Sequence, residues 1–425
     1  MVLTDAAFSQ TWEYLGLPDE IITAIAVQGR DTIYASTPGS IFKTTNAGAT
    51  WDTLVQSVRV LDLKMHPQDV NILYAALGWS SYTVSPTILK TTNAGLYWFQ
   101  ADSGIVLPPV TGFDVIEIDP LDPEILFVGS VAIAGGGNLY RTTNGGQSWI
   151  PLADTTRLLQ GVISIAVHPE TTSIVYAGTP WNGDLLRTRD GGESWSLTGL
   201  HDVQAINSVA IDPQEPQVVY ATSPPGYGIL WKSIDGGNTW TTSNTGLPIS
   251  SGGPIAIDRT NRHVYVGVGG DSATGGIHLS TNLGQTWQRM GGLNVIHRWS
   301  AFFIAQEERE LYLGTSQFGL FRTTLITSIE TSQLTPPTSP LLLQSYPNPF
   351  NSSTTLEYSI TNTTQVTIAL FNILGKEVKE LANEKKPPGR YTVRFHADNL
   401  SSGIYICRLQ TSSGYTTSIK LGLVR

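Results

Sequence analysis

Residues 187–195, Arg187-Thr188-Arg189-Asp190-Gly191-Gly192-Glu193-Ser194-Trp195, decide the fold, because five other stretches repeat their pattern. Asn or Asp, Gly and Trp stand at the same places in every copy. The six copies span residues 43–51, 90–98, 141–149, 187–195, 232–240 and 279–287. By subtraction, their tryptophans are 47, 51, 46, 45 and 47 residues apart. The chain therefore repeats one structural unit along most of its length.

Each unit reads as four short strands with apolar residues that alternate or form short runs. In the fourth unit, residues 163–167 form an apolar first strand, and His168-Pro169 turns the chain into a second strand at 174–178. A variable loop then leads to residues 185–188, which run into the repeat. This period, with about four strands per unit, is typical of a propeller blade. We found no convincing amphipathic helix pattern, so the sequence predicts an all-β fold.

A seventh unit is cut short where its turn should begin. Residues 310–314 and 319–324 match the second and third strands of the other units. At the other end of the chain, residues 11–15 resemble residues 50–54, which follow a repeat turn. We therefore expect residues 11–15 to supply the outer strand of the last blade. Residues 1–324 would then form a closed seven-bladed β-propeller without an open edge.

The repeats resemble the Asp box, or BNR repeat, of sialidases, sortilin-like receptors and many bacterial propellers. In such a turn, the Asn or Asp oxygen is expected to accept backbone N–H groups, while glycine permits a positive φ. Four copies carry Asn, which cannot exchange a proton in acid–base catalysis, so we interpret these positions as structural. The positions are Asn46, Asn93, Asn144, Asp190, Asp235 and Asn282.

The C-terminal part has a different composition. Residues 325–345 include Thr335-Pro336-Pro337-Thr338-Ser339-Pro340, which predicts an extended linker. Short alternating segments follow in residues 346–425, and their spacing indicates a small Ig-like β-sandwich. The chain is therefore expected to have two folded parts.

Residues 346–425 closely resemble the type A C-terminal sorting domain of the type IX secretion system. The resemblance rests on Tyr346-Pro347-Asn348-Pro349-Phe350, on residues 372–378, on residues 401–405 and on the basic end at 420–425. It implies recognition by the type IX secretion machinery and a protein that is secreted or held at the outer surface of a Gram-negative bacterium. The family also expects an N-terminal export signal. Residues 1–5 lack its basic start, so we expect the numbering to begin at a mature or truncated start.

Composition excludes several classes of function. The net charge of −9 argues against a nucleic-acid partner, and no apolar stretch approaches the length of a membrane span. The single cysteine, Cys407, cannot form an intramolecular disulfide, and the histidines show no metal spacing. We expect no metal and no cofactor.

Several aromatic residues are not explained by the repeat. They fall in the loops between second and third strands or before a first strand, positions that open onto one face of a propeller. An aromatic-lined mouth suits sugar rings or peptides. The predicted ligand-binding residues are Trp79, Tyr82, Trp181, Tyr227, Trp299 and Phe318.

We expect no catalytic residues and interpret the propeller as a binding or scaffold module for glycan or protein. The alternative is a glycoside hydrolase, either xyloglucanase-like or sialidase-like. A sialidase would need a triad of arginines, but Arg141, Arg187 and Arg322 stand where other repeats have lysine. A xyloglucanase would need paired carboxylates. Asp154, Asp184, Asp202 and Asp271 fall in mouth-side loops and leave that alternative open.

Overall fold

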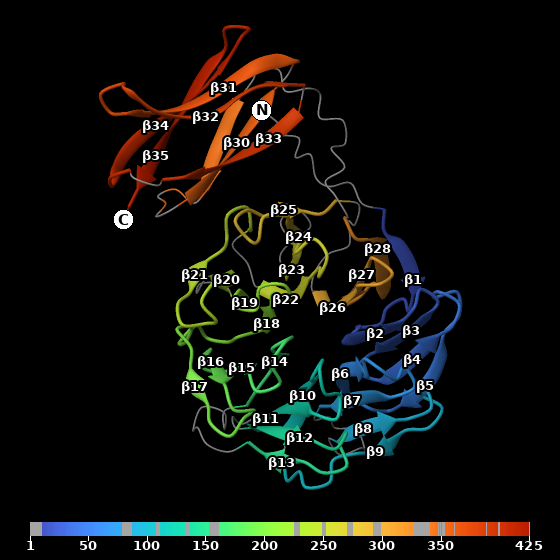
Figure 1. Ribbon diagram of the computed structural model, residues 1–425. Helices are drawn as coiled ribbons and strands as arrows, with labels where there is room; N and C mark the ends of the chain where they lie inside the picture. The colour runs from blue at the N-terminus through green and yellow to red at the C-terminus, as the bar shows by residue number, and fades with distance from the viewer. Residues whose placement is uncertain are drawn as a thin grey trace. The chain divides into compact units, whose positions relative to one another are not determined.

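The computed structural model divides the chain into two compact units, residues 1–327 and 328–425. It describes residues 11–78, 87–107, 111–132, 137–152, 161–224, 230–248, 252–269, 275–291, 299–326, 341–346, 348, 350, 353–360, 362–387, 389–397 and 400–424. All regular elements in these ranges are β-strands (Figure 1). The predicted all-β class is confirmed.

The described residues of the first unit form seven four-stranded antiparallel sheets, which we number in order around the ring. Sheet 1 comprises β2 (Ala24–Gln28), β3 (Thr32–Ser36), β4 (Ser40–Thr44) and β5 (Asp52–Gln56). Sheet 2 comprises β6 (Val60–Met65), β7 (Leu73–Leu77), β8 (Ile88–Thr91) and β9 (Phe99–Gln100). Sheet 3 comprises β10 (Thr111–Ile118), β11 (Leu126–Ala132), β12 (Gly137–Thr142) and β13 (Ile150–Pro151). Sheets 4 and 5 comprise β14 (Ser164–Val167), β15 (Val175–Gly178), β16 (Leu185–Thr188) and β17 (Ser196–Leu197); and β18 (Ser208–Ile211), β19 (Val219–Thr222), β20 (Leu230–Ser233) and β21 (Thr241–Thr242). Sheets 6 and 7 comprise β22 (Gly252–Ile257), β23 (Val264–Val268), β24 (Gly276–Ser280) and β25 (Gln288–Arg289); and β26 (Trp299–Ala305), β27 (Glu310–Thr315), β28 (Leu320–Thr324) and β1 (Glu13–Gly16).

The sheets resemble propeller blades and follow one another around a ring (Figure 1). The first strand of each sheet contacts the first strand of the next sheet, and β26 of sheet 7 contacts β2 of sheet 1. A cavity of about 460 Å³ is lined by residues of the first strands of sheets 2 to 7, from Lys64 of β6 to Phe302 of β26. Small apolar residues such as Ala166 and Ala210 let the strands approach the axis closely.

Sheet 7 joins the two ends of the unit. β1 pairs antiparallel with β28, so that Glu13 lies opposite Arg322 and Tyr14 opposite Phe321. Leu15 is buried against Ile25 of sheet 1 and Leu320 of sheet 7. An N-terminal strand therefore completes the sheet that β26 begins, which leaves β28 with partners on both sides.

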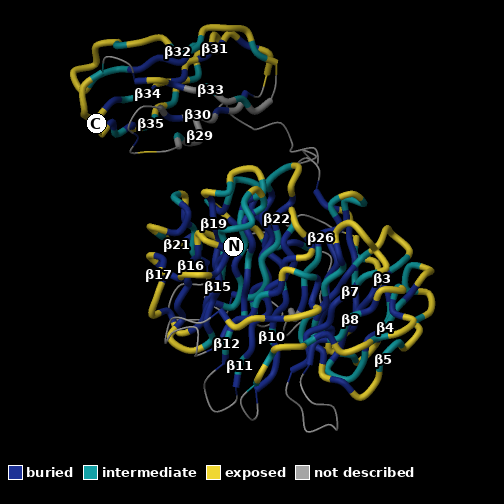
Figure 2. Tube along the Cα trace, turned by 60° about the horizontal axis from the view of Figure 1, so that its bottom comes forward, coloured by how far each residue is buried: buried dark blue, intermediate teal, exposed yellow. Residues whose placement is uncertain are grey.

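Apolar packing between neighbouring sheets holds the ring together. The second strands are buried on both faces, and β7 and β23 accordingly read as continuous apolar runs rather than alternating ones. Figure 2 shows buried residues along the strands and exposed residues mainly at the turns. Each contact cluster combines residues of adjacent sheets, as Tyr34 of sheet 1 does with Leu63 and Leu73 of sheet 2.

The second unit consists of two antiparallel sheets. One has the order β29 (Leu341–Tyr346), β30 (Ser353–Ile360) and β33 (Gly389–His396). The other has the order β32 (Glu377–Lys386), β31 (Thr364–Asn372), β34 (Gly403–Thr411) and β35 (Thr416–Leu423). A single core lies between them and includes Leu356, Ile368 and Cys407. Burial raises the pKa of the Cys407 thiol to about 12, so the cysteine is an inert core residue.

Residues at both edges of the predicted linker, 325–345, take part in the folded units. Leu325 and Ile326 are buried in the first unit, and the Leu325 N–H donates to the Arg309 carbonyl at 2.7 Å. At the other edge, residues 341–345 belong to β29, which pairs with β30. Residues 327–340 lie outside the described part of the chain.

Candidate functional site

The antiparallel order of the strands gives the first unit two distinct faces. The turns between first and second strands and between third and fourth strands lie on one face, which we call the turn face. The loops between second and third strands, such as residues 178–185 and 315–320, lie on the opposite face, which we call the loop face. Of the predicted ligand-binding aromatics, Trp181 and Phe318 lie in described loops of the loop face.

Trp181 is held out from the loop face by a closed loop between β15 and β16. Thr179 N–H donates to the Asp184 carbonyl, and Asp184 N–H returns a bond to the Thr179 hydroxyl, both at 3.0 Å. Gly183 has φ +61°, and an added Cβ would lie 2.5 Å from the backbone nitrogen of Gln204. The loop is therefore fixed against the next segment, while Trp181 remains 49% exposed.

Phe318 has a similar setting in sheet 7. The Thr315 hydroxyl accepts a 2.8 Å bond from the Phe318 N–H and donates a 3.0 Å bond to the Gly319 carbonyl. Gly319, at φ +74°, packs so closely that an added Cβ would lie 2.3 Å from the Gly16 carbonyl oxygen. Phe318 is 40% exposed. A threonine thus closes both loops, and each loop presents one aromatic ring to solvent.

The two predicted aromatics whose side chains are described, Trp181 and Phe318, lie in loops of different sheets. Trp181 belongs to sheet 4 and Phe318 to sheet 7, so two sheets separate them around the ring. Trp299 begins β26, but its side chain lies outside what the structure describes. Trp79, Tyr82 and Tyr227 also lie outside the described residues.

Two of the four candidate carboxylates lie in the described part of the chain. Asp184 is buried within its loop. Asp202 is exposed, and its Oδ2 lies 2.7 Å from Nδ1 of the neighbouring His201. Asp154 and Asp271 lie outside the described residues.

The sequence analysis missed Asp114. This residue stands at a β-bulge near the loop-face end of β10, where the register shifts between Phe113 and Val115. Burial raises its pKa to about 6, although the charge of Arg59 partly opposes this. A bulge beside a functional site is common, because it redirects one side chain. The only sequence signal was an acidic residue inside an apolar strand.

A second missed group lines the central cavity. Lys64 Nζ lies 2.8 Å from Oε2 of Glu117 and 3.9 Å from Oδ2 of Asp62, which also accepts the Ile116 N–H at 3.1 Å. Burial raises the pKa of Glu117, and Lys64 only partly offsets it. Burial alone would lower the pKa of Lys64, but the two carboxylates raise it above its ordinary value. Because Lys64 remains a paired cation, it is not available as a nucleophile.

The repeat turns use their side chains to hold the backbone. In sheet 4, Asp190 Oδ1 accepts the Ser194 N–H at 2.9 Å, and the Thr188 hydroxyl accepts the Gly192 N–H at 2.9 Å. The Oδ1 atoms of the five equivalent residues accept the same backbone N–H four positions on: Asn46, Asn93, Asn144, Asp235 and Asn282. Asn and Asp are interchangeable in this geometry, because each offers the same acceptor oxygen.

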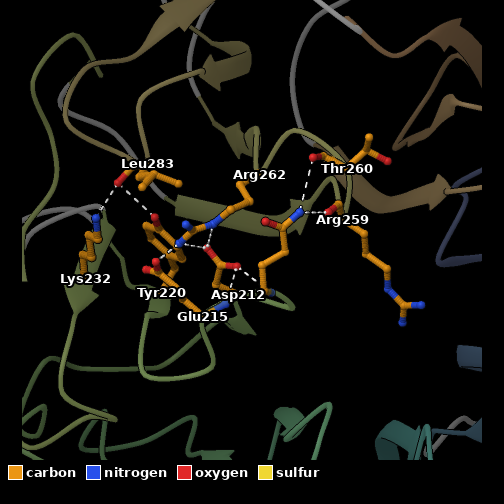
Figure 3. A network of polar contacts seen from close by, with 9 residues as sticks. Asp212, Glu215, Tyr220, Lys232, Arg259, Thr260, Arg262 and Leu283 are labelled. Atoms are coloured by element: carbon orange, nitrogen blue, oxygen red, sulfur yellow. Dashed lines mark hydrogen bonds and ion pairs between the residues drawn. The ribbon is translucent and has the colours of Figure 1, made fainter. Parts of the chain in front are cut away.

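The cations of the third strands also serve packing between sheets. Tyr220 Oη and Lys232 Nζ of sheet 5 both donate to the Leu283 carbonyl in the turn of sheet 6, at 2.9 and 2.7 Å (Figure 3). Figure 3 also shows Arg262 of sheet 6 reaching back to Asp212 of sheet 5, 2.7 Å away. The tyrosine partners were missed, although Tyr recurs at the same second-strand place in most units. These charges are therefore used within the ring.

The turns after the first strands are also structural. His66 Nδ1 accepts the N–H groups of Gln68 and Asp69, at 3.2 and 3.0 Å, and Asp119 Oδ1 accepts those of Leu121 and Asp122, at 2.8 and 3.1 Å. No group of three or more His, Cys, Asp or Glu side chains that could hold a metal ion occurs among the described residues.

Comparison with known families identifies the C-terminal part. Residues 344–422 match the model of the secretion system C-terminal sorting domain. The match covers most of the second unit. Within the described residues, no helix is long and apolar enough to cross a membrane.

The first unit resembles propeller proteins. A xyloglucanase from Hypocrea jecorina (strain QM6a) is 28% identical over 151 residues, which covers 30% of this chain and 17% of the xyloglucanase. The chain thus spans less than a fifth of that relative. Among solved structures, the Niastella koreensis GH74 enzyme has a TM-score of 0.59 at 17% identity, covering 98% of this chain and 75% of the enzyme. YCF48 bound to D1 peptide has a TM-score of 0.56 at 15% identity, covering 76% and 99%.

At these identities the structural matches show a shared propeller-like fold. The sorting-domain match shows that the protein is exported by a secretion system. The chain ends in a type IX secretion sorting domain, and the protein is secreted or displayed at the cell surface of a Gram-negative bacterium.

Proposed function

We propose that the protein is an exported seven-bladed Asp-box β-propeller with an Ig-like sorting sandwich, and that its loop face binds an extracellular glycan. Trp181 carries this proposal. A large aromatic ring that is half exposed, on a loop closed by reciprocal hydrogen bonds, is suited to stack on the apolar face of a sugar. Binding needs no ordering of such a loop, so little conformational entropy is lost.

A β-glucan is the favoured ligand class. The xyloglucanase similarity supports this choice, since the matching relative is named for that polysaccharide. Charged side chains at the contact of sheets 5 and 6 support binding over catalysis, because Lys232 and Arg262 are engaged in contacts between sheets. Phe318 supplies a second ring on the same face, across the ring from Trp181.

Affinity electrophoresis of the full chain in gels containing xyloglucan tests the proposal. We expect retention by xyloglucan and about tenfold weaker retention of Trp181→Ala, because a buried aromatic contact is lost. Ile234→Ala, which removes an exposed apolar side chain from the turn face, is the matched control and should bind like the wild type. Equal binding by Trp181→Ala and the wild type would refute the role of the loop face.

A glycoside hydrolase is the second candidate, and Asp114 is the observation that favours it. A carboxyl group with a pKa near 6 can stay protonated until it donates its proton to a leaving oxygen. Reducing-end release from xyloglucan by the full chain tests this function. Release that disappears in Asp114→Asn, while xyloglucan retention persists, would replace binding by hydrolysis as the assignment. Retention without release supports the binding module.

A further inference from the structure

The repeat turn of sheet 2 differs from the other five turns at its surface. Leu96, Tyr97 and Phe99 are 83%, 66% and 38% exposed. At the place of Leu96 the other turns carry Ala49, Gln147, Glu193, Asn238 and Gln285. At the place of Tyr97 they carry Thr50, Ser148, Ser194, Thr239 and Thr286. At these two places sheet 2 therefore replaces small or polar side chains by the large side chains of Leu96 and Tyr97.

The replacement at Tyr97 removes a hydrogen bond that the other turns make. Thr50 accepts a 2.8 Å bond from the Asn46 amide, and Ser148 accepts a 2.9 Å bond from the Asn144 amide. Thr239 instead donates to Asp235, at 2.6 Å. Ser194 and Thr286 make the corresponding bonds to Asp190 and Asn282.

In sheet 2 the backbone hydrogen bond of the turn is unchanged, but the side-chain amide of Asn93 lacks the hydroxyl partner that the other turns provide. The Tyr97 N–H still donates to Asn93 Oδ1 at 2.9 Å. The Asn93 amide nitrogen donates to no group in the described part of the chain. Tyr97 thus gives up a hydrogen bond within the turn and contributes a large exposed ring instead.

Tyr97 and Phe99 stack against each other, and we call this exposed pair of rings the platform. Tyr97 and Phe99 have ring centroids 6.4 Å apart and planes 24° from parallel. Residues 93–100 carry no charged side chain, in a chain with a net charge of −9. An uncharged platform of nearly parallel rings, bordered by Leu96 and a donor amide at Asn93, matches the apolar faces and hydroxyl rim of neighbouring sugar units in a neutral polysaccharide.

We propose that Leu96, Tyr97 and Phe99, with the Asn93 amide, form a second glycan-binding surface on the turn face of sheet 2, and that its occupant is a β-glucan chain. The choice of β-glucan rests on the proposed function, but the surface uses different residues and lies on the opposite face from Trp181. A polymer that contacts both surfaces would be held more tightly than by either surface alone.

The test converts the sheet 2 turn into the type found elsewhere in the ring. The variant Leu96→Gln/Tyr97→Thr/Phe99→Thr installs residues that occur at the same places in other turns, namely Gln147, Thr50 and Thr241. It restores the hydroxyl partner of Asn93, so its melting temperature should equal or exceed that of the wild type. Affinity for xyloglucan, measured by affinity electrophoresis and by calorimetry, should fall at least fivefold. Ile234→Ser, at an exposed apolar residue of the sheet 5 turn, is the matched control and should leave affinity unchanged.

The outcomes separate this surface from the loop face. Loss of affinity only in Trp181→Ala would overturn the sheet 2 surface and keep the proposed function. Loss of affinity only in the triple variant would overturn the proposed function of the loop face and keep the sheet 2 surface. A wild-type chain that binds neither xyloglucan nor cellohexaose would overturn both. A wild-type dimer that the triple variant converts to a monomer would show that a second copy, rather than a glycan, covers the platform.

Discussion

Arg322 Nε donates a 2.7 Å hydrogen bond to Oε2 of Glu13, a residue 309 positions earlier in the chain. The Arg322 side chain is only 5% exposed, while that of Glu13 is 51% exposed. The same guanidinium donates to the Arg30 carbonyl of sheet 1 at 3.0 Å. One buried cation therefore ties together β1, β28 and the neighbouring sheet at the point where the ring closes.

Replacing Glu13 by Gln should lower the free energy of unfolding by about 1 kcal/mol at pH 7. The hydrogen bond to a charged partner is weakened, but water competes at the exposed carboxylate and limits the loss. Urea unfolding of the full chain measures the effect. Glu20→Gln is the control, because Glu20 forms no ion pair with a described residue.

The same pair predicts a dependence on pH. The hydrogen bond from Arg322 lowers the pKa of Glu13 below its ordinary value of 4.5, against the opposing effect of burial. A carboxyl group whose pKa is lower in the folded than in the unfolded state stabilises the fold at pH values above its unfolded pKa. This contribution is lost as the pH falls from the unfolded pKa through the folded pKa. The difference between wild type and Glu13→Gln should therefore shrink below pH 4.5. A difference that stays constant down to pH 3 would contradict the assigned role of the carboxylate.

A second prediction concerns the contact between sheets 1 and 2. Tyr34 Oη and Lys43 Nζ both donate to the Ala94 carbonyl, at 3.1 and 3.0 Å, and the ammonium lies 5.0 Å from the centre of the Tyr34 ring. Tyr34→Phe and Lys43→Met should each cost about 1 kcal/mol. The double variant should cost more than their sum, because the carbonyl then loses both donors. A double-mutant cycle measured by urea unfolding checks this, and Tyr14→Phe controls for removal of an exposed hydroxyl. Strict additivity would show that the two donors act independently.

A third prediction concerns the role of the repeat turns. Asp235 Oδ1 accepts the Thr239 N–H at 2.9 Å, and an Asn would offer the same oxygen. Asp235→Asn should change stability at pH 7 by less than about 0.5 kcal/mol. The hydrogen bonds from Thr239 lower the pKa of Asp235 to about 2, so the wild type should lose stability as the pH falls from 3.8 toward 2, whereas the variant should not. Acid unfolding followed by circular dichroism checks this. Loss of xyloglucan binding in this variant would contradict a purely structural turn.

The periodic features of the fold could be predicted from the sequence, because each unit repeats the same local requirements. The Asn or Asp, Gly and Trp of six turns mark where third strands end, and Trp12 and Glu13 reveal the missing outer strand by their likeness to Trp51 and Asp52. The linker edges could not be placed in this way. Leu325 and Ile326 look like any apolar pair until the neighbouring sheet that buries them is known.

The site was predicted less completely, because it depends on distances across the ring. Trp181 and Phe318 were found as aromatics outside the repeat, and their places in the fourth and seventh units already separate them. The hydrogen bonds that close their loops could not be read from the sequence. Asp114 owes its raised pKa to burial at a bulge, which no local motif announces. The Tyr34 hydroxyl donates to a turn carbonyl 60 positions later, and a pattern of apolar strand residues does not reveal such a contact.

The last prediction concerns His278, a buried residue at a place where the other six units have Phe42, Leu89, Tyr140, Leu186, Trp231 and Phe321. Its Nδ1 is buried without a hydrogen-bond partner among the described residues. Burial lowers the pKa of the imidazole to about 4, so the folded protein holds it neutral. The unfolded chain takes up a proton below pH 6.5, and stability must therefore fall as the pH drops from 6.5 toward 4.

His278→Leu should raise the free energy of unfolding by about 1 kcal/mol at pH 7.5, because it removes a buried polar atom that has no hydrogen-bond partner among the described residues. At pH 5 the gain should be larger by roughly 2 kcal/mol, because the variant no longer pays for deprotonation. Urea unfolding at the two pH values measures both gains, with His201→Leu as an exposed control. An equal gain at pH 7.5 and pH 5 would mean that packing alone, and not the buried neutral imidazole, limits the stability of sheet 6.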